Sequence, residues 1–106
     1  MKAFGKIIVA VCKYDYGIED RGSSGWEEIF IPALHKAVND LEVIPFWLEE
    51  HGYPAKHNKL QNQLKEFISS QNPDFVFLML MNEEVEKITL DWIKKRAILV
   101  NWFSET

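Results

Sequence analysis

The chain has 106 residues, 47% of them hydrophobic, and its 16 acidic and 12 basic side chains give a net charge of −4. This length and composition predict one globular domain. The acidic balance argues against a nucleic-acid partner, because phosphate binding needs a basic surface. The lone cysteine, Cys12, excludes a disulfide framework, and no apolar run approaches the roughly 20 residues of a membrane span. We therefore expect a cytoplasmic protein with no membrane span.

The first predicted element is a strand, the continuous apolar run at 7–12. A long polar loop at 13–23 follows it. Apolar residues spaced by three and four then predict a helix over 24–41, with Ile29 among its inward-facing side chains. Pro32 lies inside this pattern, so we expect the helix to kink or to restart there.

The second predicted strand is the run at 43–48, which contains Pro45. Because proline removes a donor from the ladder of hydrogen bonds, this strand belongs on an edge of the sheet. A helix is predicted over 57–71, and the sequence Asn-Pro-Asp at 72–74 ends it. The third strand, at 75–81, comes directly after this turn.

The last two predicted elements are a short helix over 90–96, with Thr89 as its cap, and an apolar strand at 97–103. Strands that alternate with helices predict an α/β fold with a parallel sheet and right-handed crossovers. When the strands are numbered along the chain, an edge position for the second strand fits the order 2-1-3-4. We therefore expect a Rossmann-like or flavodoxin-like three-layer sandwich with four parallel strands.

In this order the last strand is an edge, which is an aggregation liability when it stays uncovered. We therefore expect residues 1–106 to form one domain of a longer protein, with self-association through the strand at 97–103 as a further expectation. Ligands of such sheets bind at the carboxyl ends of the strands, near the point where the winding reverses. The loop at 13–23 leaves the sheet at that point.

This loop has about eleven residues, whereas about 2–6 usually join a strand to a helix. Tyrosine rings can cover the apolar face of a sugar, and carboxylates accept hydrogen bonds from its hydroxyl groups. A carboxylate such as Asp15 can also act as a general base. The alternative is a structural loop in which Arg21 pairs with Asp15 or Asp20. The segment 22–25 offers backbone N–H groups to a phosphate, although we favour its role as a flexible lead-in to the helix.

The three histidines, His35, His51 and His57, lack the spacing of metal ligands, so we expect no metal site. His51 and Tyr53 follow the second strand at the ligand-binding edge and are secondary candidates for substrate binding. The chain also lacks the acidic pair of a phospho-receiver and the glycine-rich loop that holds a flavin. We expect no cofactor.

Three short motifs carry a resemblance to a known family: Lys13-Tyr14-Asp15-Tyr16-Gly17, Arg21-Gly22 and Asn101-Trp102-Phe103-Ser104-Glu105. With them, nearly all of the chain resembles the N-terminal half of the CgeB-like (spore maturation protein) glycosyltransferases, which are two-domain enzymes of the GT-B type. In that family two acids follow the last motif. Glu105 matches the first of them, and Thr106 stands in place of the second.

The resemblance implies transfer of a sugar from a nucleotide-sugar donor to a hydroxyl acceptor, without a metal. The N-terminal half of such enzymes mainly builds the acceptor side, so residues 1–106 alone are expected to be inactive. Asp15 and Glu105 are then the candidate catalytic residues. The expected substrate-binding residues are Lys13, Tyr14, Asp15, Tyr16, Gly17, Arg21 and Gly22. The alternative is a non-catalytic flavodoxin-like module that binds a small ligand or another protein.

Overall fold

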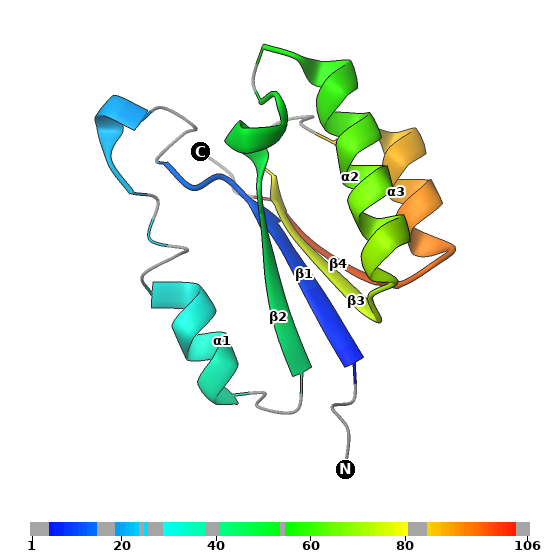
Figure 1. Cartoon of the computed structure of the whole chain (residues 1–106), viewed down its shortest axis with the longest axis horizontal. Helices are drawn as coiled ribbons and strands as arrows, with labels where there is room; N and C mark the ends of the chain where they lie inside the picture. Colours follow the sequence, from blue (N-terminus) through cyan, green and yellow to red (C-terminus); the bar gives the residue numbers. More distant parts are fainter. Residues whose placement is uncertain are drawn as a thin grey trace.

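The computed structural model describes residues 5–14, 19–23, 25, 29–37, 41–53, 55–80 and 85–103. Its elements in chain order are β1 (Gly5–Val11), η2 (Glu19–Arg21), α1 (Ile31–Ala37), β2 (Leu41–Trp47), η4 (Leu48–His51), α2 (His57–Gln71), β3 (Phe75–Leu80), α3 (Lys87–Lys94) and β4 (Ile98–Phe103). The strands form one parallel sheet in the order β2-β1-β3-β4 (Figure 1). The predicted α/β class and strand order are confirmed.

The sheet lies between two helical layers, and the side chains of each strand alternate between them. Ile8 and Ala10 point into a cluster with apolar residues of α2 and α3. Ile7 and Val9 point the other way, into a cluster with Phe30 and residues of α1. Figure 1 shows α1 on one side of the sheet and α2 with α3 on the other. Because both faces of β1 are buried, its sequence is continuously apolar rather than alternating.

The helix α2 has the predicted bounds, because local signals specify both its packing and its end. Leu60, Leu64 and Ile68 are buried on one helical face, and burial of each such side chain contributes about 1.5–3 kcal/mol. Asn72 adopts the left-handed conformation (φ 49°) and donates its N–H to the carbonyl of Ile68. Pro73 follows and prevents the helix from continuing.

Only part of the first predicted helix lies among the described residues. α1 begins at Ile31, so Pro32 is its second residue. The N–H groups of Ile29 and Phe30 both donate to the carbonyl of Gly25, so a helical turn already precedes α1, and the expected kink or restart at Pro32 stays a prediction. Two parts of the prediction are wrong: Ile29 is 72% exposed rather than inward-facing, and Leu41 lies in β2.

The third helix starts earlier than predicted, and Thr89 is not its cap. α3 begins at Lys87 after the N-cap residue Glu86, and Thr89 is fully buried inside the first turn. Among the described residues, the Thr89 hydroxyl has no hydrogen-bond partner. Val85 is buried in the core just before the helix, and this tertiary contact favours the earlier start.

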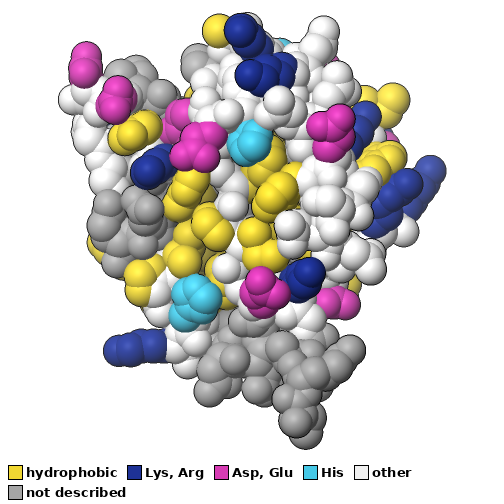
Figure 2. Space-filling model, in the orientation of Figure 1, with side chains coloured by type: hydrophobic (Ala, Val, Ile, Leu, Met, Phe, Trp, Pro, Cys, Tyr) yellow, Lys and Arg dark blue, Asp and Glu magenta, His cyan; other side chains and the backbone are white. Residues whose placement is uncertain are grey.

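Pro45 lies on an edge strand, as predicted, because β2 is the first strand of the sheet. Figure 2 shows apolar side chains between the α1 side and the α2 side of the molecule, where β2 lies in Figure 1. At the opposite edge, β4 pairs with β3 in the described sheet. Self-association through β4 stays a prediction. Across the described ranges, no helix combines the length and the apolar character that crossing a membrane requires.

Candidate functional site

The loop after β1 closes on itself close to the sheet. Tyr14 and Ser23 form an isolated antiparallel bridge that joins the two ends of the loop. Between them, Glu19–Arg21 form the 3-10 helix η2, and the N–H of Gly22 donates to the carbonyl of Glu19 at 3.0 Å. Gly22 has a φ of 84°, a conformation that suits glycine. The loop is therefore a closed projection from the carboxyl end of a central strand.

A carboxylate from the neighbouring strand's loop holds the base of this projection. Glu49 in η4 accepts the N–H of Lys13 on one carboxylate oxygen and the N–H of Tyr14 on the other, both at 2.8 Å. Hydrogen bonds from backbone N–H groups to a carboxylate are among the stronger ones in proteins. Glu49 thus adds a contact from outside the loop to the bridge and the hydrogen bonds within it.

Glu49 was missed from the sequence, although the strand order contains the signal for it. In the parallel pairing, Val11 lies opposite Trp47 at the ends of β1 and β2. Two residues beyond the end of each strand, Glu49 therefore lies beside Lys13. Only the combination of strand order and register locates this contact, since neither residue belongs to a recognisable local motif.

The tip of the loop presents polar groups to solvent. Glu19, Asp20 and Arg21 are all exposed, and the Tyr14 hydroxyl donates to the carboxylate of Glu19 at 3.5 Å. Because the phenol proton is donated to Glu19, the phenol oxygen and the carboxylate oxygens can accept hydrogen bonds from a ligand hydroxyl.

Four of the predicted site residues, Asp15, Tyr16, Gly17 and Glu105, lie outside the described residues, so their roles stay predictions.

The segment 22–25 does not offer all of its N–H groups to a phosphate. The N–H of Gly22 is bonded to Glu19, and the N–H of Gly25 donates to the Ser23 hydroxyl at 3.0 Å. Gly25 in turn accepts the N–H of Ile29 on its carbonyl oxygen at 3.0 Å. These contacts favour the interpretation of the segment as a lead-in to the helix.

The secondary candidates His51 and Tyr53 pack against core residues at the carboxyl edge of the sheet. The His51 ring stacks on Phe46, with centroids 4.0 Å apart and an interplanar angle of 10°, and its Nδ1 lies 2.5 Å from Oε1 of Gln63. Tyr53 packs against the core cluster that includes Phe46. These contacts are those of a packed side chain, and the role of His51 and Tyr53 in substrate binding stays a prediction.

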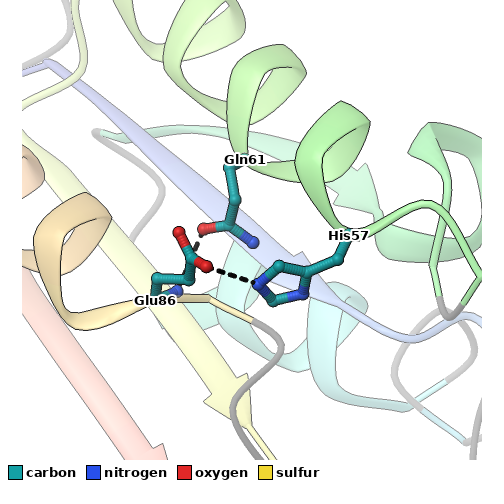
Figure 3. Close-up of polar contacts among 3 residues, drawn as sticks. All are labelled: His57, Gln61 and Glu86. Carbon is teal, nitrogen blue, oxygen red and sulfur yellow. Dashed lines mark hydrogen bonds and ion pairs between the residues drawn. The ribbon is translucent and has the colours of Figure 1, made fainter.

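A second polar cluster lies at the same edge of the sheet, between the N-termini of α2 and α3 (Figure 3). Nε2 of His57 lies 3.0 Å from Oε2 of Glu86, and both side chains are about half exposed. The buried side chain of Gln61 accepts the N–H of Glu86 at 3.0 Å. Val85 and Lys87 line a hollow of about 390 Å³ beside this pair. The cluster fastens the start of α3 to α2, and it could not be predicted from the sequence because Gln61 lies in an otherwise apolar helical face.

Within the described part of the chain, no group of three or more histidine, cysteine, aspartate or glutamate side chains could hold a metal ion. Comparison with protein-family models, with curated proteins and with solved structures finds no match to this chain.

Proposed function

We propose that residues 1–106 form the acceptor-side domain of a glycosyltransferase, and that the loop at 13–23 binds the hydroxyl acceptor. Under this proposal a nucleotide-sugar donor is held mainly by a second domain outside these residues, as the resemblance to CgeB-like GT-B enzymes implies. The domain alone then binds sugar weakly and transfers none.

The main support for the proposal is that the Glu49 carboxylate binds the first backbone N–H groups of the loop. Backbone N–H groups after the first strand of a Rossmann-like sheet are the usual position for a nucleotide phosphate. Here the N–H groups of Lys13 and Tyr14 already bind the Glu49 carboxylate. An incoming phosphate would meet a negative charge at the same place. This arrangement supports an uncharged ligand for the loop, and a sugar hydroxyl suits the Tyr14 phenol oxygen and the exposed carboxylates of Glu19 and Asp20.

The test is a titration of the 15N-labelled 106-residue chain followed by NMR. The probes are glucose, galactose, N-acetylglucosamine and maltose, and the comparison ligands are uridine diphosphate and guanosine diphosphate. We expect at least one sugar to shift the amide signals of Tyr14 and residues 19–23, with a dissociation constant of about a millimolar (about −4 kcal/mol).

Two results would contradict the proposal. One is a nucleotide that binds with sub-micromolar affinity, roughly −8 kcal/mol or better, because that would make this domain the donor side. The other is the absence of any sugar-dependent shift in residues 13–23. A matched variant, Glu19→Gln, removes the exposed carboxylate while it keeps the shape of the side chain, and it should weaken the sugar response of the loop.

A further inference from the structure

The hollow between the starts of α2 and α3 has the size of a small ligand site. Its volume is about 390 Å³, and the residues that line it are His57, Val85, Glu86, Lys87 and Ile88. Ligand pockets have volumes of about 300–1,000 Å³, so this hollow suits a single small ring. None of its lining residues belongs to the loop at 13–23.

Two hydrogen-bond acceptors at this hollow are open. Figure 3 shows the side chains of His57 and Glu86 reaching toward each other, with Nε2 of His57 3.0 Å from Oε2 of Glu86. A neutral imidazole that donates from Nε2 has a lone pair on Nδ1. Within the described part of the chain, no other side-chain contact engages Nδ1 of His57 or Oε1 of Glu86, and both side chains are about half exposed. The pair therefore offers two acceptors to a ligand.

The start of α3 adds hydrogen-bond donors. Lys87 and Ile88, which line the hollow, are the first two residues of this helix. The first N–H groups of a helix have no acceptor within the helix, and the side chain of the N-cap residue Glu86 makes no hydrogen bond to them. The ammonium group of Lys87 is bound to Asp91 at 3.1 Å. The donors that remain for a ligand are thus backbone N–H groups.

Apolar surface completes the lining of the hollow. Val85 is 3% exposed and belongs to the core, whereas Ile88 is 69% exposed. A single exposed isoleucine is normal on a protein surface. Here, however, it lies beside open donors and acceptors, and apolar surface with a few polar groups is typical of ligand pockets.

From these contacts we infer that the hollow binds one ring of a neutral sugar or cyclic polyol, as a second hydroxyl-binding site apart from the loop at 13–23. A hydroxyl group both donates and accepts hydrogen bonds. It can therefore satisfy the acceptors of His57 and Glu86 and the N–H groups of α3 together, while the C–H face of the ring packs on Ile88. The inference rests on the lining of the hollow and not on the proposed role of the loop.

Charged ligands fit the same lining less well. A carboxylate or phosphate only accepts hydrogen bonds from N–H groups, and it would lie beside the negative charge of Glu86. An ammonium group only donates, so it would leave the N–H groups of α3 without an acceptor. It would also meet the positive end of the helix dipole.

The test is an NMR titration of the 15N-labelled 106-residue chain with three sugars that share one ring and differ in charge: glucose, glucosamine and glucuronate. The amide signals of residues 57–61 and 85–88 report on the hollow, and those of residues 13–23 report on the loop. Each site therefore gives its own dissociation constant. We expect glucose to shift the signals of the hollow with a dissociation constant of about a few millimolar, and both charged sugars to bind there at least about threefold more weakly.

Two glutamate variants test the polar part of the site. Glu86→Gln keeps the shape of the side chain and removes its charge, so it should weaken glucose binding in the hollow at least about fivefold. It should also reduce the preference for glucose over glucuronate, because the opposing negative charge is gone. Glu66→Gln is the matched control, since Glu66 is an exposed residue of α2 that does not line the hollow. It should leave both affinities unchanged.

Two isoleucine variants test the apolar part of the site. Ile88→Asn should weaken glucose binding in the hollow, because the sugar ring loses its apolar contact. Ile29→Asn is the matched control, since Ile29 is equally exposed (72%) and lies before α1. The 15N spectrum of each variant checks that the chain is folded.

The inference is overturned if glucose leaves the signals of residues 57–61 and 85–88 unchanged, or if either charged sugar binds there more tightly than glucose. It is also overturned if Glu66→Gln weakens binding as much as Glu86→Gln does, or Ile29→Asn as much as Ile88→Asn. All of these outcomes are measured at the hollow. An absent response at residues 13–23 would contradict the proposed acceptor loop and leave this inference standing.

Discussion

The loops after β1 and β2 leave adjacent strands at the same edge of the sheet, yet among the described residues of the two loops only the segment after β2 packs closely into the core. After β2, Leu48 is fully buried, the His51 ring stacks on Phe46, and the N–H of Tyr53 donates to the carbonyl of Leu48 at 3.1 Å. After β1, the described tip of the loop is exposed. The segment after β2 is part of the core, and the described part of the loop after β1 projects from it.

The difference shows how a neighbouring segment can hold the start of a projecting loop whose described residues 19–23 are exposed. Glu49 belongs to the packed segment and fixes the first N–H groups of the projecting one. Ordering a loop costs conformational entropy, and here a neighbouring, rigid segment supplies the contacts that offset this cost. The exposed carboxylates of Glu19 and Asp20 then face solvent, as expected of a loop that carries a function.

Removing the buried anchor should have the largest effect on stability. Leu48→Ala leaves a cavity at a fully buried position, so we expect it to lower the free energy of unfolding by about 2–5 kcal/mol. Urea denaturation followed by circular dichroism measures this loss. A loss below about 0.5 kcal/mol, the range of an exposed position, would show that the segment after β2 is not an anchor.

Breaking the link between the two segments should have the next largest effect. Glu49→Ala leaves the N–H groups of Lys13 and Tyr14 without their acceptor, and we expect a loss of about 1–3 kcal/mol together with faster hydrogen exchange at both amides. Glu50→Ala is the matched control, because Glu50 is the exposed neighbour of Glu49. Equal exchange rates in the two variants would contradict the assigned role of Glu49.

Replacement of His51, whose ring stacks on Phe46, should lower the stability less than either Leu48→Ala or Glu49→Ala. His51→Phe keeps an aromatic ring on Phe46 and loses only the bond to Gln63, so we expect a loss of about 0.5–1.5 kcal/mol. His51→Ala loses both contacts and should cost more. If His51→Phe abolished sugar binding without any change in the melting temperature, His51 would be a ligand-binding residue after all.

The exposed tip should contribute least to stability. For Glu19→Gln and Asp20→Asn we expect changes within about 0.5 kcal/mol, because both side chains are exposed. Their effect should instead appear in the sugar titration. A large loss of stability with unchanged sugar binding would make the tip a structural brace.

Local signals explain which elements could be predicted from the sequence. The apolar spacing of α2 and the following Asn72 and Pro73 specify that helix without reference to the rest of the molecule. Pro45 places β2 on an edge because proline lacks an N–H donor. The start of α3 could not be predicted, since the buried Val85 and the bond from Glu86 to Gln61 decide it.

The same distinction applies to the candidate site, since one part of it follows from the strand order and the other depends on tertiary contacts. Strand order alone predicts that the loop at 13–23 leaves the carboxyl edge of the sheet beside the winding reversal, and the structure places its described part there. The residue that holds the loop, Glu49, depends on the register between β1 and β2, which the sequence does not state. The packing of His51 on Phe46 likewise exists only once α2 lies over the sheet.

The most direct test of this account measures the affinity of the chain for the best-binding sugar in three forms: the natural sequence, Glu49→Gln and Glu50→Gln. NMR titration gives the dissociation constant and identifies the amides that shift. If Glu49 holds a binding loop, its loss should weaken binding at least about fivefold, or roughly 1 kcal/mol, and the shifts should fall in residues 13–23. Glu50→Gln should bind as the natural sequence does. Equal affinities in all three forms, or shifts confined to the segment after β2, would contradict the account.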